Sequence, residues 1–274
     1  MKYFVMAILL ILFVTTVHAQ KVDYYGKPES GYIMIGHAKN AKSVFLNNKP
    51  IQIDKDGYFL FGFDRDDKGE FTVKVDFNDG TSEIKKLNVP EREYVIQKLN
   101  NIKEKYVTPP KSELARIERE AGEMKKARTE IGRIDSAYYA NGFVRPITGG
   151  RLTSVFGSQR ILNGVPKSPH NGLDLAAPAG TTIRACADGK VIIAGKKFYY
   201  NGNFVLLDHG QGLNSVYLHM RKIFVKDGQY VKKGQKLGEI GTTGRSTGPH
   251  LHWGVQWYGK RIDPESLLEM GVIK

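Results

Sequence analysis

The chain contains a single cysteine, Cys186, among its 274 residues. One cysteine excludes a disulfide within the chain. A catalytic thiolate would need an electropositive setting, whereas the neighbours of Cys186 in TTIRACADGKVIIAG are largely apolar and typical of a strand. We therefore expect Cys186 to be a small buried residue without a catalytic role.

After its first twenty residues the sequence lacks any apolar run long enough to span a bilayer. The start, MKYFVMAILLILFVTTVHAQ, has a basic Lys2, about 14 apolar residues and a small-x-small-like site before Gln20. This pattern predicts a secretory signal peptide over residues 1–19, because an uncleaved anchor would need roughly 20 apolar residues. We expect an exported protein of the periplasm, the cell envelope or the medium, with no stable membrane span after cleavage.

Acidic residues are scarce, with 28 Asp and Glu against 41 Lys and Arg and a net charge of +13. The excess lies from Arg145 to the end, where 18 basic residues face 8 acidic ones, whereas residues 20–144 hold 22 against 20. Beyond a solubilising role, such a field favours an anionic partner. An exported chain rarely meets nucleic acid, and no aromatic-interleaved basic motif is present. We expect an acidic cell-envelope polymer as the partner and no nucleic acid.

The chain divides by pattern into three parts after the signal peptide. Residues 20–90 carry six short apolar segments separated by turn signals such as Asp56-Gly57, which predicts a small antiparallel β-sandwich of the immunoglobulin-like kind. Residues 91–142 are charged, which predicts a linker with one amphipathic helix. We expect Ser112 to cap this helix and four apolar side chains to form its buried face. These are Leu114, Ile117, Ala121 and Met124.

Residues 143–274 alternate in the manner of strands and carry glycine at each break, with no convincing helix before the last ten residues. So many tight corners predict an all-β sheet folded on itself, with a groove lined by inward-facing residues. The fold class is therefore mostly β, with this C-terminal sheet preceded by the sandwich and the helical linker.

Four histidines and one aspartate in this last part can bind a metal or transfer protons. His170 and Asp174 lie four apart in SPHNGLDLAAPAG, His219 ends SVYLHM, and His250 and His252 lie two apart in STGPHLHWGV. Residues two or four apart on an extended chain share a face, and a catalytic zinc site uses three protein ligands with one open position. We expect a hydrolytic zinc centre in which one imidazole of the HLH pair binds the metal and its neighbour transfers protons.

These segments carry a family resemblance. HNGLDLAAPAGTTIRACADGKV, LDHGQGLNSVYLHM, VKKGQKLGEIGTTGRSTGPHLHWGV and the preceding RLTSVFGSQR resemble the M23 family of zinc metallopeptidases, of the lysostaphin and LytM type, over about residues 150–264. The resemblance implies a folded antiparallel β-sheet with an open groove and peptidoglycan endopeptidase activity. It implies one Zn²⁺ per chain, bound by His170, Asp174 and His252, with His219 and His250 as catalytic residues. His209 matches a structural histidine of the family.

The resemblance leaves other readings open. Some members have lost metal ligands and regulate other wall enzymes, so a catalytically silent wall-binding regulator is the alternative, although no ligand is missing here. Carboxypeptidase trimming of the same polymer is another. Residues 20–142 are long enough to reach the groove, so the sequence leaves open whether they target peptidoglycan or make an autoinhibitory contact.

Overall fold

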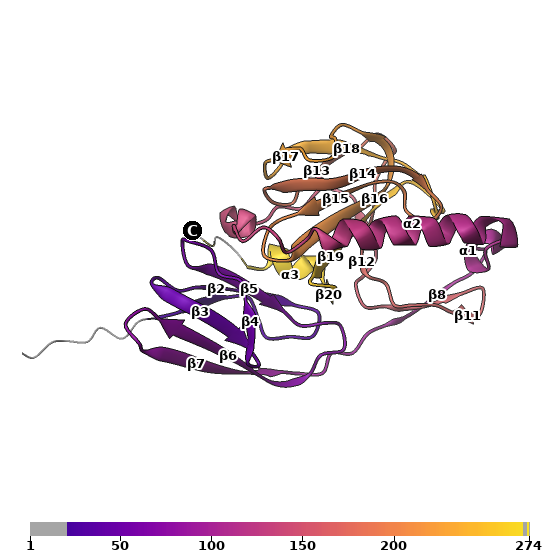
Figure 1. The fold of residues 1–274 in the computed structure, drawn as a ribbon. Helices are drawn as coiled ribbons and strands as arrows, with labels where there is room; N and C mark the ends of the chain where they lie inside the picture. Colours follow the sequence, from indigo (N-terminus) through magenta and orange to yellow (C-terminus); the bar gives the residue numbers. More distant parts are fainter. Residues whose placement is uncertain (1–20, 271–272, 274) are drawn as a thin grey trace, which may run out of the picture.

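The computed structural model describes residues 21–270 and residue 273, so the predicted signal peptide lies outside the described residues. Within this part of the chain, no helix is long and apolar enough to cross a membrane. The described chain is mostly β, as predicted, with a layered N-terminal unit followed by a larger folded sheet (Figure 1).

The N-terminal unit consists of two antiparallel sheets, ordered β1-β2-β5 and β4-β3-β6-β7. Alternate residues of β6, namely Val73, Val75 and Phe77, are buried, and they belong to the same apolar core as Phe61 of β5. The six predicted strands are present, and β1 is an additional one. The strands are β1 (Asp23–Tyr25), β2 (Ile33–His37), β3 (Ala41–Leu46), β4 (Lys49–Ile51), β5 (Tyr58–Gly62), β6 (Gly69–Phe77) and β7 (Ser82–Val89).

The segment after the sandwich contributes more than one helix. Strand β8 (Ile96–Leu99) pairs in parallel with β10 (Gln159–Leu162), far along the chain. The helices that follow are short α1 (Glu104–Val107), long α2 (Lys111–Thr129) and the 3-10 helix η1 (Tyr138–Asn141).

Two details of the predicted helix are wrong. Pro110, not Ser112, occupies the N-cap of α2, and no side chain caps its first turn. The buried face carries Glu120 and Met124, whereas Leu114 is 49% exposed. The reason is that a polar bond shares in the attachment of α2, since Tyr199 N donates to Glu120 Oε2 at 2.6 Å.

The C-terminal part forms a ten-stranded sheet whose main path runs β17-β14-β15-β16-β19-β12-β9, and β18 curls back from β16 to pair with β13. The short α3 (Pro264–Leu268) follows the last strand, and Asp263 caps it by accepting from Glu265 N. The strands from β9 onward not yet given are β9 (Arg151–Ser154), β11 (Val165–Pro166), β12 (Gly172–Ala176), β13 (Thr182–Arg184), β14 (Gly189–Phe198), β15 (Gly202–Asp208), β16 (Leu213–Ile223), β17 (Tyr230–Val231), β18 (Lys236–Ile240), β19 (His250–Trp257) and β20 (Lys260–Ile262).

The N-terminal sheets and the C-terminal sheet share one apolar core. Polar bonds also join them: Gln211 Nε2 donates to the carbonyl of Tyr58 at 2.9 Å, and Arg92 Nη2 lies 2.8 Å from Asp263 Oδ2. The Asp263 carboxylate is almost fully buried, so this ion pair satisfies a charge that would otherwise be costly in the interior. The sandwich is thus bonded to the end of the large sheet.

Candidate metal centre and groove

The register of two antiparallel strands brings Asp174 and His252 together. Asp174 of β12 lies directly opposite His252 of β19, and side chains opposite each other on one face of a sheet are close neighbours. This register needs a close backbone approach, because a Cβ on Gly172 would lie 2.3 Å from the carbonyl oxygen of Trp253. His170 precedes β12, where its own N–H donates to the carbonyl of Ser158 at 2.9 Å.

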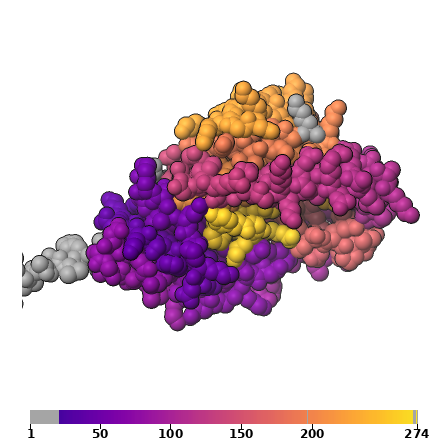
Figure 2. Space-filling model, viewed as in Figure 1, coloured from indigo at the N-terminus to yellow at the C-terminus, as the bar shows by residue number. Residues whose placement is uncertain are grey.

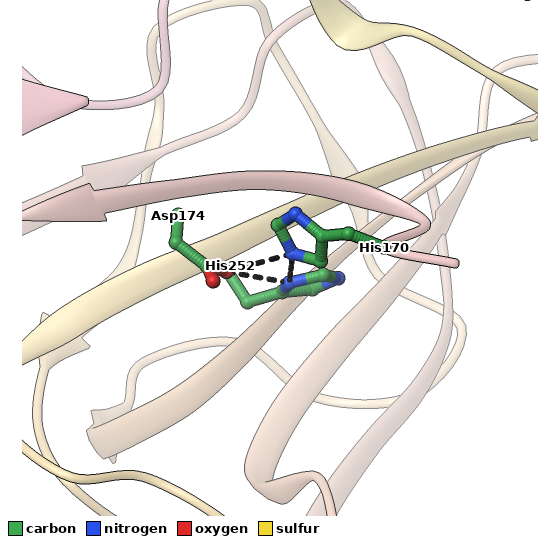
Figure 3. Close-up of side chains that lie close together, drawn as sticks. All are labelled: His170, Asp174 and His252. Atoms are coloured by element: carbon green, nitrogen blue, oxygen red, sulfur yellow. Dashed lines mark hydrogen bonds and ion pairs between the residues drawn. The ribbon is translucent and has the colours of Figure 1, made fainter. Parts of the chain in front are cut away.

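The three side chains form a tight triangle of donor atoms (Figure 3). His170 Nε2 lies 3.0 Å from Asp174 Oδ1 and 3.0 Å from His252 Nδ1, and His252 Nδ1 lies 2.8 Å from Asp174 Oδ1. Ligands at about 2 Å from a tetrahedral zinc ion are roughly 3.3 Å apart. The triangle therefore fits such an ion, and its two imidazoles and one carboxylate are zinc ligands by type.

Hydrogen bonds at Nδ1, the ring nitrogen that points away from Asp174, fix the tautomer of His170. Its Nδ1 donates to the carbonyl of Val155 at 2.9 Å, with Ser154 Oγ also at 2.9 Å. A neutral imidazole has only one N–H, so the lone pair is left on Nε2, which faces Asp174 and His252. Hydrogen bonding of the outer nitrogen to a carbonyl is the usual way in which a protein orients a metal-binding histidine.

His219 reaches the site through an unusual backbone conformation. Leu218 of β16 lies opposite His252 and lines the groove, so strict alternation would turn His219 to the other face. His219 instead has φ 64, in the left-handed region, and β16 is irregular here, with register shifts in its pairing. Its imidazole enters the groove and its Nδ1 donates to the carbonyl of Thr243 at 2.8 Å.

The second imidazole outside the triangle is that of His250. Its Nδ1 donates to the carbonyl of Gly248 at 2.9 Å, and its Nε2 lies 4.0 Å from Asp174 Oδ1. The rings of His219 and His250 are 4.7 Å apart between centroids. The structure therefore brings all five predicted residues together, three in the triangle and two beside it.

Burial controls the charge of these groups. Burial alone would raise the pKa of Asp174, but its interactions with His170 and His252 outweigh that effect and hold the pKa well below its usual value. Burial lowers the pKa of His252 to about 4 and, with repulsion from His250 and His252, that of His219 to about 3. At neutral pH the site holds an ionised carboxylate and two neutral imidazoles, the forms that bind a metal or accept a proton.

Arg160 is a site residue that the sequence reasoning missed. Its Nη2 donates to Asp174 Oδ2 at 2.5 Å and to Ser154 Oγ at 3.0 Å. This bond occupies the second carboxylate oxygen, so that Oδ1 alone faces the imidazoles. The only signal in the sequence is the position of Arg160 in RLTSVFGSQR, and a spacing rule does not predict its partner.

The remaining described histidines and the cysteine lie elsewhere. His37 stacks on Tyr58 with ring centroids 4.4 Å apart. His209 is buried, with its Nδ1 donating to the carbonyl of Asp188 at 2.7 Å. Cys186 is fully buried, as predicted, and burial raises the pKa of its thiol to about 11. A thiol held protonated in this way is a poor nucleophile.

A groove with a volume of about 390 Å³ surrounds the triangle. Its floor runs along β16 and β19, from Leu218 and His252 to Asn214 and Gln256. Helix α2 provides part of the wall, and residues 160–171 provide another part. In Figure 2 the magenta α2 lies across the front of the molecule, with the salmon β10–β11 segment beneath its right end. Within the described chain, no side chain of residues 21–90 lines this groove.

Comparison with known proteins gives a consistent result. The model of peptidase family M23 matches residues 168–264. Peptidoglycan DD-endopeptidase ShyB of Vibrio cholerae serotype O1 is 46% identical over 95 residues, which are 35% of this chain and 22% of ShyB. DD-carboxypeptidase/endopeptidase Mpg of Neisseria meningitidis serogroup B is 38% identical over 126 residues, which are 45% of this chain and 28% of Mpg. The matched part thus spans about a quarter of these relatives.

A solved structure extends the likeness beyond the C-terminal sheet. A protein from Pseudomonas aeruginosa assigned to peptidase M23 is 30% identical, covers 90% of this chain and 97% of its own, and superimposes with a TM-score of 0.63. Because this match leaves out only a tenth of the chain, it extends well beyond residues 168–264 into the part that precedes the C-terminal sheet. The chain belongs to peptidase family M23.

Proposed function

We propose that this protein is an exported, zinc-dependent peptidoglycan hydrolase that cleaves peptide bonds in cross-linked stem peptides, as a D,D-endopeptidase. The observation that carries the proposal is the triangle of His170, Asp174 and His252 with two further imidazoles beside it. The name of ShyB, a peptidoglycan DD-endopeptidase, supports the substrate class, and the name of Mpg, a DD-carboxypeptidase/endopeptidase, supports the type of bond.

His170 Nε2, Asp174 Oδ1 and His252 Nδ1 would hold one Zn²⁺, and their mutual distances fit it. When bound, Zn²⁺ would lower the pKa of a water toward 7 and polarise the scissile carbonyl. Arg160 holds the carboxylate of Asp174 in place through its other oxygen. The open groove along β16 and β19 gives an extended peptide access to these atoms.

His219 and His250 would transfer the protons. In each, Nδ1 donates to a backbone carbonyl, so Nε2 is the atom left to accept a proton from the attacking water or to stabilise the developing oxyanion. The low pKa of His219 keeps its ring neutral at neutral pH, so the lone pair of its Nε2 is free. Either role requires a ring that reaches the substrate without binding the metal.

Incubation of purified sacculi with the full-length protein tests the proposal. We expect release of stem-peptide fragments, its loss on addition of a chelator and its return with Zn²⁺. Mass spectrometry of digested cross-linked dimers should show two monomers, the endopeptidase products, whereas a carboxypeptidase would only shorten the peptides. Binding to sacculi without any zinc-dependent release would contradict hydrolysis and favour a wall-binding regulator.

A further inference from the structure

Four basic side chains line the groove, and three of them already have partners. Arg160 is paired with Asp174 at 2.5 Å, and Lys167 Nζ donates to the carbonyl of Val107 at 2.8 Å. The guanidinium of Arg245 lies 4.6 Å from the ring centre of Tyr200. Asp174 is the only acidic residue among the described groove-lining residues, so the groove carries an excess of positive charge.

The fourth, Arg128, has no partner among the described residues. Its Nε is shielded from water and has no hydrogen-bond acceptor, and its side chain makes no ion pair in the described chain. Burial lowers the pKa of this guanidinium, and no acidic group offsets that effect. A half-buried, unpaired cation costs free energy in the free protein, which a bound anion would recover.

The place of Arg128 along the groove follows from the contacts of α2. Glu120 accepts from Tyr199 N, and one turn later Met124 packs with Val216 and Leu218 on the floor. Arg128 lies a further turn, about 6 Å, along the helix. Gly132, three residues after the end of α2, packs on the ring of Tyr258, which directly follows β19. The helix therefore runs toward the end of β19.

Arg128 is therefore displaced from the metal triangle toward the Asn214–Gln256 end of the floor. Gln256 lies four residues beyond His252 on β19, which is about 13 Å in a strand. A group bound by Arg128 would belong to a part of the substrate remote from the scissile bond. Such contacts select substrates without taking part in bond cleavage.

We propose that Arg128 is a substrate-specificity residue that binds a free carboxylate of the stem peptide in the groove. The inference rests on the proposed function for its substrate, since stem peptides carry free carboxylates. A guanidinium whose Nε–H is buried and unpaired matches a carboxylate in charge and in geometry. Helix α2 is then a wall of the substrate site as well as a connection between two sheets.

The test compares cross-linked muropeptide dimers with the same dimers after their carboxylates have been converted to amides. With zinc-loaded full-length protein, we expect Arg128→Met to lower kcat/KM for the native dimers about tenfold to a hundredfold, mainly through KM. Cleavage of the amidated dimers should change little. Arg128→Lys should retain part of the preference, because it keeps the charge without the planar fork.

Arg119→Met is the matched control. Arg119 lies on the exposed side of the same helix and makes only a surface ion pair with Glu123, at 3.7 Å. The Arg119→Met substitution removes the same charge as Arg128→Met and should leave kcat/KM for both dimers unchanged. The inference would be overturned if Arg128→Met, with the thermal stability of the wild-type protein, lost kcat/KM equally on unmodified and amidated dimers. Such a result would show that Arg128 only supports the wall of the groove.

Measurements of substrate binding distinguish a failure of this inference from a failure of the proposed function. Calorimetry with zinc-free protein measures recognition of the native and amidated dimers without hydrolysis. If the zinc-loaded protein cleaves neither dimer, the proposed function fails, but a preference for the native dimer that is lost in Arg128→Met still supports the carboxylate site. Equal binding of both dimers by the wild-type protein, or an unchanged preference in the variant, overturns it.

Discussion

His170 donates its Nδ1 proton to the carbonyl oxygen of Val155, 2.9 Å away. This bond leaves a lone pair on the atom that faces Asp174 and His252, so it orients the ring as a metal ligand. His219 and His250 use the same device, each donating Nδ1 to a backbone carbonyl. Position distinguishes the metal ligands from the other two imidazoles. His170 and His252 each place a nitrogen within 3.0 Å of Asp174 Oδ1, whereas Nε2 of His250 lies 4.0 Å from that atom.

The first prediction separates ligands from catalytic residues by metal content. His170→Ala removes one corner of the triangle and should lose the stoichiometric zinc, with hydrolysis lost at the same time. His250→Ala should keep one zinc per chain and still lose most of its turnover. Elemental analysis of the purified variants gives the comparison, and a zinc-free His250→Ala protein would show that the ligand assignment is wrong.

The second prediction concerns the left-handed backbone at His219. Asn tolerates φ 64 better than most residues, so His219→Asn removes the imidazole with little backbone strain. We expect zinc binding and thermal stability near those of the wild-type protein, with kcat on cross-linked dimers lowered about a hundredfold to ten-thousandfold. Wild-type kcat in a folded, zinc-loaded variant would exclude His219 from the proton transfers.

The third prediction concerns the attachment of α2. Glu120 accepts from Tyr199 N at 2.6 Å and from Arg116 Nε at 2.8 Å, and Glu120→Ala leaves that backbone N–H without its acceptor. The free energy of unfolding should fall by about 2 kcal/mol, and protease cleavage within residues 111–129 should become faster.

The control for this variant is Glu118→Ala, an exposed position on the same helix. It should change stability by less than about 0.5 kcal/mol. Equal effects of the two substitutions in urea denaturation would mean that the bond to Tyr199 does not hold α2 in place.

The fourth prediction is an acid destabilisation that originates in His209. Burial lowers the pKa of this imidazole to about 4, whereas an unfolded histidine has a pKa near 6.5. Between these values the unfolded chain binds a proton that the folded chain does not, so the free energy of unfolding decreases as the pH falls from about 6.5 to 4. The contribution of His209 is about 3 kcal/mol.

His209→Gln isolates this contribution. Urea denaturation at pH 7 and pH 4 should show a smaller loss of stability in the variant than in the wild-type protein, by about 3 kcal/mol. Burial also lowers the pKa of His219 and of His252, but both residues are present in both proteins and cancel in the comparison. An identical loss in both would show that His209 does not titrate differently in the folded state.

Much of the local structure could be predicted because its signals are local. Alternation in FTVKVDF and turn pairs such as Asp56-Gly57 identify strands and corners without any knowledge of their neighbours. The apolar spacing gave a wrong buried face for α2, because Glu120 takes part in that face and the helix has no continuous apolar stripe. The boundaries at 90 and 142 stay a prediction, and the β8–β10 pairing and the common core cross them.

By itself, the sequence determined the chemistry that is available: a complete set of four histidines and one aspartate, a basic C-terminal half and no second cysteine. It also determined that His250 and His252 share one face of a strand, because side chains alternate with period two along an extended chain. These properties depend on residue type and on short spacings.

Only the tertiary structure decided how that chemistry is arranged. It set Asp174 opposite His252, turned His219 into the groove through a left-handed residue, and placed Arg160 on the second oxygen of Asp174. It also brought Arg128 to the wall of the groove. Each of these contacts joins residues far apart in the chain or depends on irregular backbone, so packing and register decide them and no local pattern encodes them.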